Sequence, residues 1–586
     1  MNSAQMILKY WLRSKKNFVK SFIYQMIYVG ISLIVPVLLG SMVGGLTRPG
    51  ATVQLLFIQL ALIIGLSVLG YFFNKAGRIW TAEVSTRAMY DLRKDINTSI
   101  YRQDFSYFDK YETGQLVARA TSDVEQTRMI FGFGLATGLQ SLVQLIGVIV
   151  AVFLLSFQFG FIYLGFIAVH LTISFLIIKK LKPLFLETRE AFGDLTTTIR
   201  ENIIGAEIVR IFSEQKKENI KFMKNNTRFF SASVKSQKWN SLFMPLNFFV
   251  ILGITVVVIY LGGTMVATGQ PGFSLDLIIT FQSYTGILTF PLTIFTQIMV
   301  MYIQADAALV RIREVLESSP SITEKENPIP IDDMRGRVEF DHVQFGYTKS
   351  NLILKDLSFQ IPAGKKLAIL GTTGSGKSTI INLLPRFYDV DGGSIEIDGA
   401  DIRDYKLNDL RKNIGIVSQE TFLFNKSIRE NITFGKEDAP MEEIIKAAKI
   451  ADLHDFVMSL PDQYDTIVGE RGARLSGGQK QRLSIARALI INPKILVFDD
   501  STSSVDVETE YNIQNALERI MKDTTTFIIT QRLSTIRNAD YIMVLDKGRM
   551  VGFGDHTKLY NENVLYRQIY ETLFRKQKVV EGAAVR

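Results

Sequence analysis

A glycine-rich segment in the second half of the chain carries the residue types that hold a nucleotide phosphate. An apolar run, Lys366 to Leu370, precedes it, and a second apolar run, Ile380 to Pro385, follows it. Glycines let backbone N–H groups curl around a phosphate, a lysine neutralises the β- and γ-phosphates, and a hydroxyl holds magnesium. We therefore predict a P-loop between a strand and a helix, formed by Gly371, Thr372, Thr373, Gly374, Ser375, Gly376, Lys377, Ser378 and Thr379.

A carboxylate and a second small-residue segment complete a candidate ATP site. The apolar run Ile495 to Phe498 ends in Asp499, which could reach a Mg²⁺ ion at the carboxyl end of a parallel sheet. Many buried strands end this way, so the feature is weak alone. Upstream, a second segment opens a predicted helix, and its amino end suits a γ-phosphate. That segment is Ser476, Gly477, Gly478 and Gln479. ATP and Mg²⁺ are the expected ligands.

The first half of the chain predicts six membrane spans. A span needs about 20 mostly apolar residues, because hydrocarbon cannot satisfy backbone polar groups. The expected spans are residues 21–47, 50–74, 130–155, 159–178, 241–267 and 277–303. We predict a multi-domain chain: a six-helix all-α transmembrane domain at 1–310, a linker at 311–335, and an α/β P-loop domain at 336–586.

Charge gives the predicted orientation in the membrane. The formal net charge is +9, but no Lys/Arg block is interleaved with aromatic residues, which argues against nucleic acid as a partner. The loops after spans one, three and five hold only Arg48 and Asp276, whereas the other connections are long and highly charged. By the positive-inside rule, both termini and the long connections are cytoplasmic. The absence of cysteine excludes disulfides and thiolate metal sites.

The two long connections, about residues 75–128 and 179–238, are expected to be helices that continue past the bilayer. Composition alone leaves solvated loops equally open. Their turning points lie at residues 107–116 and 211–216. Five polar residues fall within the spans, and such groups more often join helices than bind a ligand. They are His170, Asn247, Gln282, Tyr284 and Gln297, and the transported substrate does not follow from them.

The Leu-Ser-Gly-Gly-Gln segment that begins at Leu475, between the P-loop and Asp499, resembles the signature of ATP-binding cassette proteins. The whole chain resembles a half-transporter of the bacterial multidrug and lipid exporter type. The resemblance implies that Tyr347 stacks on adenine and that Gln419 lies near magnesium with Ser378 and Asp499. It also implies an X-loop at residues 466–472, a D-loop at 503–506, and coupling helices at the two turning points.

Two residues depart from the family pattern, and both occupy positions at which the family's residues take part in ATP hydrolysis. The family's catalytic Glu is replaced by Asp500, whose carboxylate is one methylene shorter, and its switch His is replaced by Gln531. General-base catalysis requires about 2.6–3.2 Å to the transferred proton and contributes roughly 10²- to 10⁴-fold. A glutamine amide can donate a hydrogen bond but cannot take up a proton. Tolerated variation is the alternative reading.

The expected function is therefore one half of an ATP-driven exporter of hydrophobic or amphipathic compounds in a bacterial cytoplasmic membrane. Because cassettes of this family pair head to tail, we expect a heterodimer with a second half-transporter that carries Glu and His at the positions of Asp500 and Gln531. One alternative is a homodimeric lipid or drug flippase in which Asp500 is a slow base. An alternative of another class is an ATP-gated channel or regulatory subunit.

Overall fold

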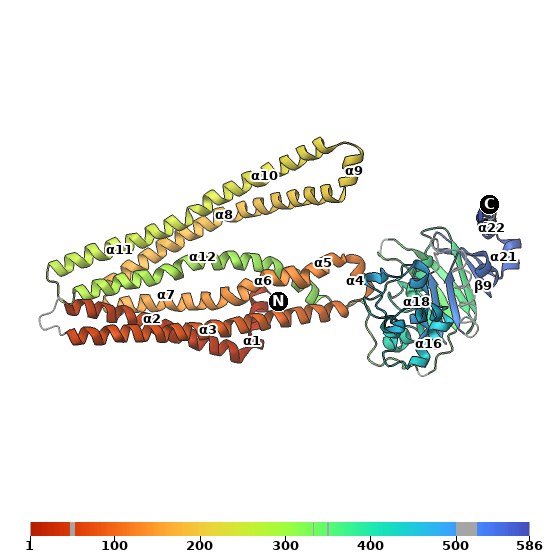
Figure 1. Cartoon of the computed structure of the whole chain (residues 1–586), viewed down its shortest axis with the longest axis horizontal. Helices are drawn as coiled ribbons and strands as arrows, with labels where there is room; N and C mark the ends of the chain where they lie inside the picture. Colours follow the sequence, from red (N-terminus) through yellow and green to blue (C-terminus); the bar gives the residue numbers. More distant parts are fainter. Residues whose placement is uncertain (1, 47–52, 332, 349–350, 500–523, 585–586) are drawn as a thin grey trace. The chain divides into compact units, whose positions relative to one another are not determined.

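The computed structural model describes residues 2–46, 53–331, 333–348, 351–499 and 524–584. The chain divides into two compact units (Figure 1). The first comprises Met1–Arg102 and Glu112–Ser318, and the second comprises Gln103–Tyr111 and Ser319–Arg586. The short segment of residues 103–111 therefore belongs to the second unit, although the residues on either side of it belong to the first.

The elements described in the first unit are all helices. Its elements are α1 (Ser3–Arg13), α2 (Lys15–Leu46), α3 (Val53–Tyr101), α5 (Thr113–Ala118), η1 (Arg119–Asp123), α6 (Val124–Met129), η2 (Ile130–Gly134), α7 (Leu135–Leu155), α8 (Phe157–Ile204), α9 (Ala206–Ile211), α10 (Gln215–Ser241), α11 (Phe243–Ala267) and α12 (Leu275–Glu317). Among the described residues, six helical segments are long and apolar enough to cross a membrane. The expected six-helix architecture is confirmed.

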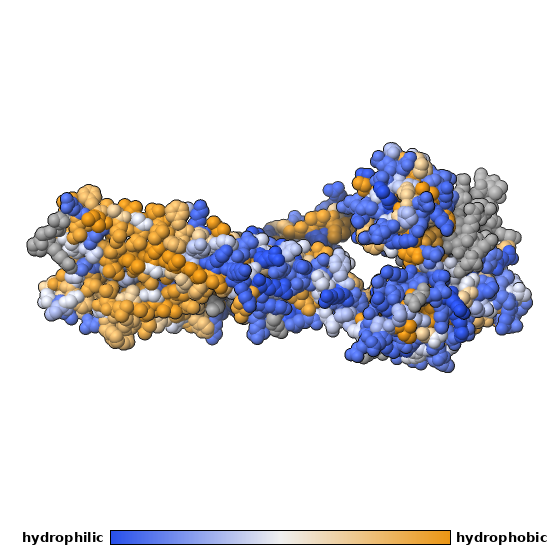
Figure 2. All heavy atoms as spheres, turned by 90° about the horizontal axis from the view of Figure 1, so that it is seen from below, coloured by the Kyte–Doolittle hydropathy of each residue, from blue (hydrophilic) through white to orange (hydrophobic). Residues whose placement is uncertain are grey.

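Two of the membrane helices extend well beyond the thickness of a bilayer. Helices α3 and α8 contain 49 and 48 residues without a break. At 1.5 Å per residue, each is more than 70 Å long, against about 30 Å of hydrocarbon. Only 6% of the most apolar window of α3 is buried within the chain. Figure 2 shows apolar side chains gathered over the part of this unit that contains α2 and α3, as expected of a surface that faces lipid.

Hydrogen bonds between helices use several of the polar residues in the spans. The Tyr284 hydroxyl donates to the Leu33 carbonyl at 2.8 Å, and the Gln282 amide donates to Thr255 at 3.2 Å. Nε2 of His170, which is buried, lies 3.1 Å from the Leu292 carbonyl. These contacts join helices to one another. The Asn247 side chain lies outside the described residues, and Gln297 is exposed.

The second unit contains two sheets. A four-stranded antiparallel sheet has the order β2-β1-β4-β5, with β1 (Val338–Phe345), β2 (Leu354–Ile361), β4 (Gly392–Ile397) and β5 (Ala400–Asp401). A six-stranded sheet has the order β10-β9-β3-β8-β7-β6, with β3 (Lys366–Gly371), β6 (Ile414–Val417), β7 (Ile495–Asp499), β8 (Thr525–Ile529), β9 (Tyr541–Asp546) and β10 (Arg549–Gly554). Its strands are parallel except β10, which lies antiparallel at the edge.

Helices complete this unit around the six-stranded sheet. They are α4 (Phe105–Lys110), α13 (Lys377–Leu383), α14 (Leu407–Lys412), α15 (Ile428–Ile432), α16 (Met441–Ile450), α17 (His454–Met458), α18 (Gly477–Leu489), α20 (Leu533–Arg537), α21 (His556–Glu562) and α22 (Val564–Ala584). Alternate residues of β3 enter different cores: Leu367 and Ile369 enter one, Ala368 and Leu370 the other. Both faces are covered, so the strand is apolar throughout.

Two element boundaries differ from the sequence prediction. The helix after the P-loop begins at Lys377 rather than Ile380 and ends at Leu383. It begins there because Gly376, with φ of +105°, turns the chain into the helix as its N-cap. Helix α12 continues to Glu317, so the extended connection begins at Ser318 rather than at residue 311.

Candidate nucleotide-binding site

The predicted phosphate-binding residues lie where parallel strands of the six-stranded sheet end. Strand β3 ends at Gly371, β7 at Asp499, β8 at Ile529 and β6 at Val417. In the register of the sheet, Asp499 is the partner of Ile529. Carboxyl ends of parallel strands meet at one edge, where ligands bind in open α/β sheets. The P-loop, Gln419, Asp499 and Gln531 therefore all leave the sheet at this edge.

The P-loop backbone adopts conformations that require glycine. Gly374 and Gly376 have φ of +78° and +105°. A Cβ on Gly371 would stand 2.2 Å from the Leu545 carbonyl oxygen, so the loop passes too close to β9 for any side chain. A Cβ on Gly374 would meet nothing within 4 Å. The loop is thus closely packed where it leaves the strand and open at its tip.

Lys377 is held within the same loop. Its ammonium donates to the carbonyls of Gly371 at 3.1 Å and Thr372 at 2.8 Å. Burial lowers the pKa of the Lys377 ammonium, and the negative charge of Asp499 opposes this shift. These two acceptors are neutral carbonyls, and a phosphate would be a stronger partner for the charge.

The three residues predicted to hold the metal are distributed over three strand ends. The Ser378 hydroxyl donates to Asp499 at 3.4 Å, which joins the P-loop to β7. Gln419 follows β6 and is exposed, and Gln531 follows β8 and is also exposed. Asp500 and the predicted D-loop at residues 503–506 lie outside the described residues.

Tyr347 lies beside the P-loop helix with much of its ring open. It is 47% exposed, and its hydroxyl lies 3.4 Å from Thr379 of α13. The edge of the ring packs against Tyr388, at 5.2 Å between centroids and 88° between planes. An aromatic ring fixed on one side and open on the other can stack on a nucleobase.

The signature segment begins helix α18. Ser476 is the N-cap and forms a capping box with Gln479. A Cβ on Gly477 would meet nothing within 4 Å, so the approach to this helix end is open. Within the described residues, no hydrogen bond joins residues 476–479 to the P-loop. No hydrogen bond thus links the two predicted phosphate-binding segments within the part of the chain that the structure describes.

Sequence reasoning did not identify the residues that attach α4 to this unit. Phe105 stacks on Phe387 at 4.0 Å between ring centroids, and the Tyr388 hydroxyl donates to Asp109 at 2.7 Å. Asp104 caps α4 and also accepts from the backbone N–H of Ser321. Tyr388 thus contacts both α4 and Tyr347. The resemblance to the family predicted a coupling helix at the first turning point, but not its contacts. The aromatic residues near position 387 belong to no sequence motif that could have predicted those contacts.

The loop fits a triphosphate with a divalent cation. The Ser375 side chain is 1% exposed, and its hydroxyl has no hydrogen-bond partner among the described residues. A buried hydroxyl without a partner costs about 1–3 kcal/mol, which a phosphate oxygen at the loop would offset. Ser378 and Asp499 supply the oxygen ligands that Mg²⁺ prefers.

Comparison with known proteins gives the same assignment for the two halves. The family model "ABC transporter transmembrane region" matches residues 18–292, and the model "ABC transporter" matches residues 354–503. The chain belongs to the ABC transporters. It is a multi-pass membrane protein with a transport ATPase domain that binds ATP.

The relatives identify the type of transporter. A putative multidrug export ATP-binding/permease protein of Bacillus subtilis (strain 168) is 33% identical over 95% of this chain and 97% of that protein. An ATP-dependent lipid A-core flippase of Syntrophus aciditrophicus (strain SB) is 37% identical over 85% of this chain and 82% of that protein. The structure of a bacterial Atm1-family ABC exporter with ATP bound matches with a TM-score of 0.82 and 27% identity, over 95% and 98% of the two chains. The chain has the exporter fold.

Proposed function

We propose that this chain is one half of a heterodimeric exporter in the bacterial cytoplasmic membrane, with its termini in the cytoplasm. The observation that carries the proposal is the pair Asp500 and Gln531, which stand where the family has Glu and His. The ATP-binding positions of the P-loop, Gln419, Asp499 and the signature segment keep the family's residue types. The chain would bind ATP at its own P-loop and hydrolyse it slowly.

The position of Gln531 supports its assignment as the switch residue. It lies two residues beyond the end of β8, the strand between β3 and β7. It is exposed at the edge that also presents Asp499 and the P-loop. A neutral amide there can contact a γ-phosphate, but it offers no formal positive charge to a transition state in which negative charge develops.

Magnesium, when bound, would supply positive charge that offsets the charge on the phosphates during transfer. Ser378, Gln419 and Asp499 would hold it. The protein's own residues do the rest: the P-loop amides and Lys377 position the triphosphate, Tyr347 supports the base, and residues 476–479 act on the nucleotide of a second cassette. Asp500 would leave the attacking water poorly oriented, because general-base catalysis depends on close approach.

The second turning point favours a dimer. Helices α8 and α10 run side by side to α9 at their tip (Figure 1). Ile208, Ile211 and Phe212 at this tip are 62%, 68% and 72% exposed. Exposed apolar side chains clustered at one tip mark a protein contact. We assign this contact to the cassette of the second half-transporter.

Hydrophobic or amphipathic compounds are the proposed cargo, because the relatives are named as a multidrug exporter and a lipid flippase. The test compares ATPase activity of this chain alone with that of the chain co-expressed with a half-transporter carrying Glu and His. Activity that arises only in the pair supports the heterodimer. If the chain alone is comparably active, or if Asp500→Glu greatly raises the ATPase activity of the chain alone, a homodimeric pump replaces it.

A further inference from the structure

Positive charge is concentrated at the amino-terminal end of the chain. The first 82 residues contain eight Lys or Arg residues and no Asp or Glu. Five of the eight lie in α1 and in the first turns of α2, namely Lys9, Arg13, Lys15, Lys16 and Lys20. Clusters of roughly four to eight such residues beside a membrane span attract anionic lipid head groups. The segment therefore has the charge expected of a surface that contacts an anionic membrane.

Four of these five charges have no counter-charge within the chain. The Arg13 guanidinium lies 2.8 Å from the carboxylate of Asp95 on α3, so its charge is paired. The four lysines are exposed, and no carboxylate in the described part of the chain forms an ion pair with any of them. Four ammonium groups are thus available to an anion outside the chain.

Helix α1 is attached to the chain by one face only. The Tyr10 hydroxyl donates to the same α3 carboxylate at 2.8 Å, and Trp11 Nε1 donates to the Phe131 carbonyl at 3.2 Å. On the other face, Leu8 and Leu12 lie one turn apart and are 50% and 41% exposed. Amphipathic helices with exposed apolar and basic residues lie in the membrane interface, with the apolar side chains toward the acyl chains. The free face of α1 has this character.

The first turns of α2 expose a matching face. Lys16, Val19, Lys20 and Ile23 occupy positions i, i+3, i+4 and i+7 of the helix, so they lie on one side of it. Both lysines are exposed, and Val19 and Ile23 are each 50% exposed. This side of α2 therefore presents two charges together with two apolar side chains, which is the combination that a phospholipid head group and its acyl chains require.

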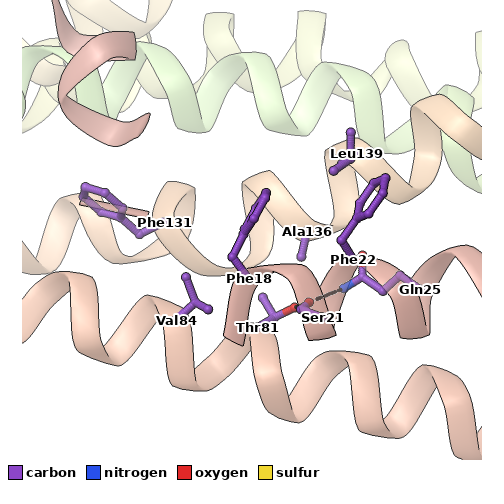
Figure 3. Close-up of a pocket in the computed structure, with 9 residues that line it drawn as sticks. All are labelled: Phe18, Ser21, Phe22, Gln25, Thr81, Val84, Phe131, Ala136 and Leu139. Carbon is purple, nitrogen blue, oxygen red and sulfur yellow. Dashed lines mark hydrogen bonds between the residues drawn. The ribbon is translucent and has the colours of Figure 1, made fainter. Parts of the chain in front are cut away.

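Hydrogen bonds between α2 and α3 fix the depth of this face. The hydroxyls of Ser21 and Thr81 lie 2.7 Å apart, and the Gln25 amide donates to Thr81 at 3.0 Å (Figure 3). The neighbouring residues in sequence are Lys20 and Trp80, and the Lys20 ammonium lies 4.2 Å from the centroid of the Trp80 ring. Because tryptophan is typical of the interface between membrane and water, this contact places Lys20 at the level of the head groups.

We propose that α1 and the first turns of α2 bind an anionic membrane lipid, whose phosphate lies between Lys16 and Lys20 and whose acyl chains lie along Val19 and Ile23. The inference rests on the proposed cytoplasmic placement of the termini, which assigns this lipid to the inner leaflet. It goes beyond export, because a lipid held there is a resident partner rather than cargo. A zwitterionic head group carries its own cation beside the phosphate, so it gains less from two lysines.

The test uses the full-length chain in lipid nanodiscs, with Trp11→Phe and Trp239→Phe so that Trp80 is the one remaining tryptophan. Bromine on an acyl chain quenches a nearby indole. Brominated phosphatidylglycerol diluted in phosphatidylcholine is compared with brominated phosphatidylcholine diluted in phosphatidylglycerol, at equal bromine content. We expect the relative binding constant to favour phosphatidylglycerol by about fivefold or more, the factor for one lysine near the surface, and to fall as salt is added.

Matched variants make the result specific to this face. Lys16→Gln with Lys20→Gln should bring the preference close to one, whereas Lys16→Arg with Lys20→Arg should retain it, because the charges are retained. The control is Lys224→Gln with Lys238→Gln, which removes two exposed charges from α10 and should leave the preference at Trp80 unchanged. As a second measurement, native mass spectrometry of the unsubstituted chain should detect more bound phosphatidylglycerol than phosphatidylcholine after exposure to an equimolar mixture.

Two results would overturn the proposal. Equal quenching by the two lipids at low salt would mean that Trp80 senses an unselective lipid shell. A preference that persists in Lys16→Gln with Lys20→Gln would mean that other groups select the lipid. Because both leaflets of a nanodisc have the same composition, neither result depends on the side at which the termini lie or on ATP hydrolysis, so failure of this inference is distinct from failure of the proposed function.

Discussion

Changing Tyr388 to Phe removes one hydroxyl and retains the ring that packs between Phe345 and Phe105. The lost interaction is the 2.7 Å hydrogen bond to Asp109 on α4. Burial, together with the hydrogen bond to Asp109, raises the pKa of the Tyr388 hydroxyl, so it is a proton donor throughout the physiological range. The substitution therefore tests how firmly α4 is attached, without disturbing the packing around it.

The magnitude follows from the partner's exposure. A hydrogen bond to a charged group contributes about 1.5–3 kcal/mol, but Asp109 is exposed and water competes for it. We expect the lower end, about 1.5 kcal/mol, which is a change of roughly twelvefold in the equilibrium between attached and detached α4. Hydrogen exchange of the α4 amides in the full-length chain measures that equilibrium directly, provided that exchange is limited by opening.

A double-mutant cycle and a matched control make the result specific. Asp109→Asn should have a similar effect, and the double variant should add little, because both changes remove the same bond. Tyr560→Phe removes another tyrosine–carboxylate contact, the 3.5 Å bond to Glu571, and should leave α4 exchange unchanged. Unchanged exchange in Tyr388→Phe, or fully additive effects in the cycle, would refute the reasoning.

Three other changes test the cassette and its connection. Gly371→Ala places a Cβ 2.2 Å from the Leu545 carbonyl and should cost about 1–3 kcal/mol, seen as a lower thermal midpoint and weaker ATP binding at this P-loop. The control is Gly477→Ala, at a glycine without a positive φ whose added carbon meets nothing within 4 Å, and it should leave the thermal midpoint nearly unchanged. The Arg487 guanidinium donates hydrogen bonds to the carbonyls of Asn431 and Phe422, and Arg487→Lys removes this paired geometry, so the thermal midpoint should fall. The control is Arg474→Lys, which loses one exposed 3.4 Å hydrogen bond and should leave the thermal midpoint unchanged. Burial raises the pKa of Asp104, but hydrogen bonds from Ser106 and Ser321 outweigh it and hold the value below the usual range. The stabilisation of α4 by the Asp104 carboxylate is therefore present above the ordinary pKa of Asp and is lost as the pH falls through the lowered pKa of Asp104. The α4 amides should lose protection from hydrogen exchange below about pH 4, and this loss should be smaller in Asp104→Asn.

Local sequence patterns were enough to predict the membrane helices and the P-loop. The charge-free runs identified the membrane helices, because a span must satisfy its own backbone polar groups. The strand and glycine loop around Lys377 were predicted because the loop's chemistry depends on adjacent residues. The boundary at Gly376 was missed, since its left-handed conformation depends on packing against β2 and β9.

Contacts between distant segments could not be predicted. Asp109 and Tyr388 are 279 residues apart, and nothing in either sequence neighbourhood specifies the other. Helix α1 and the hydrogen bond from Trp11 to η2 were also missed. An amphipathic segment of only 11 residues is difficult to distinguish, in sequence, from an ordinary charged terminus. The packing of Ser21, Gln25 and Thr81 depends on the register of α2 against α3, which composition does not determine.

The most direct test of the unequal ATP sites compares two matched substitutions in the co-expressed pair. Changing the partner's catalytic Glu to Gln should abolish ATPase activity, whereas Asp500→Asn in this chain should leave most of it, because the account places little hydrolysis at Asp500. A loss of half or more of the activity in Asp500→Asn, with protein level and ATP binding unchanged, would contradict the account and identify Asp500 as a working base.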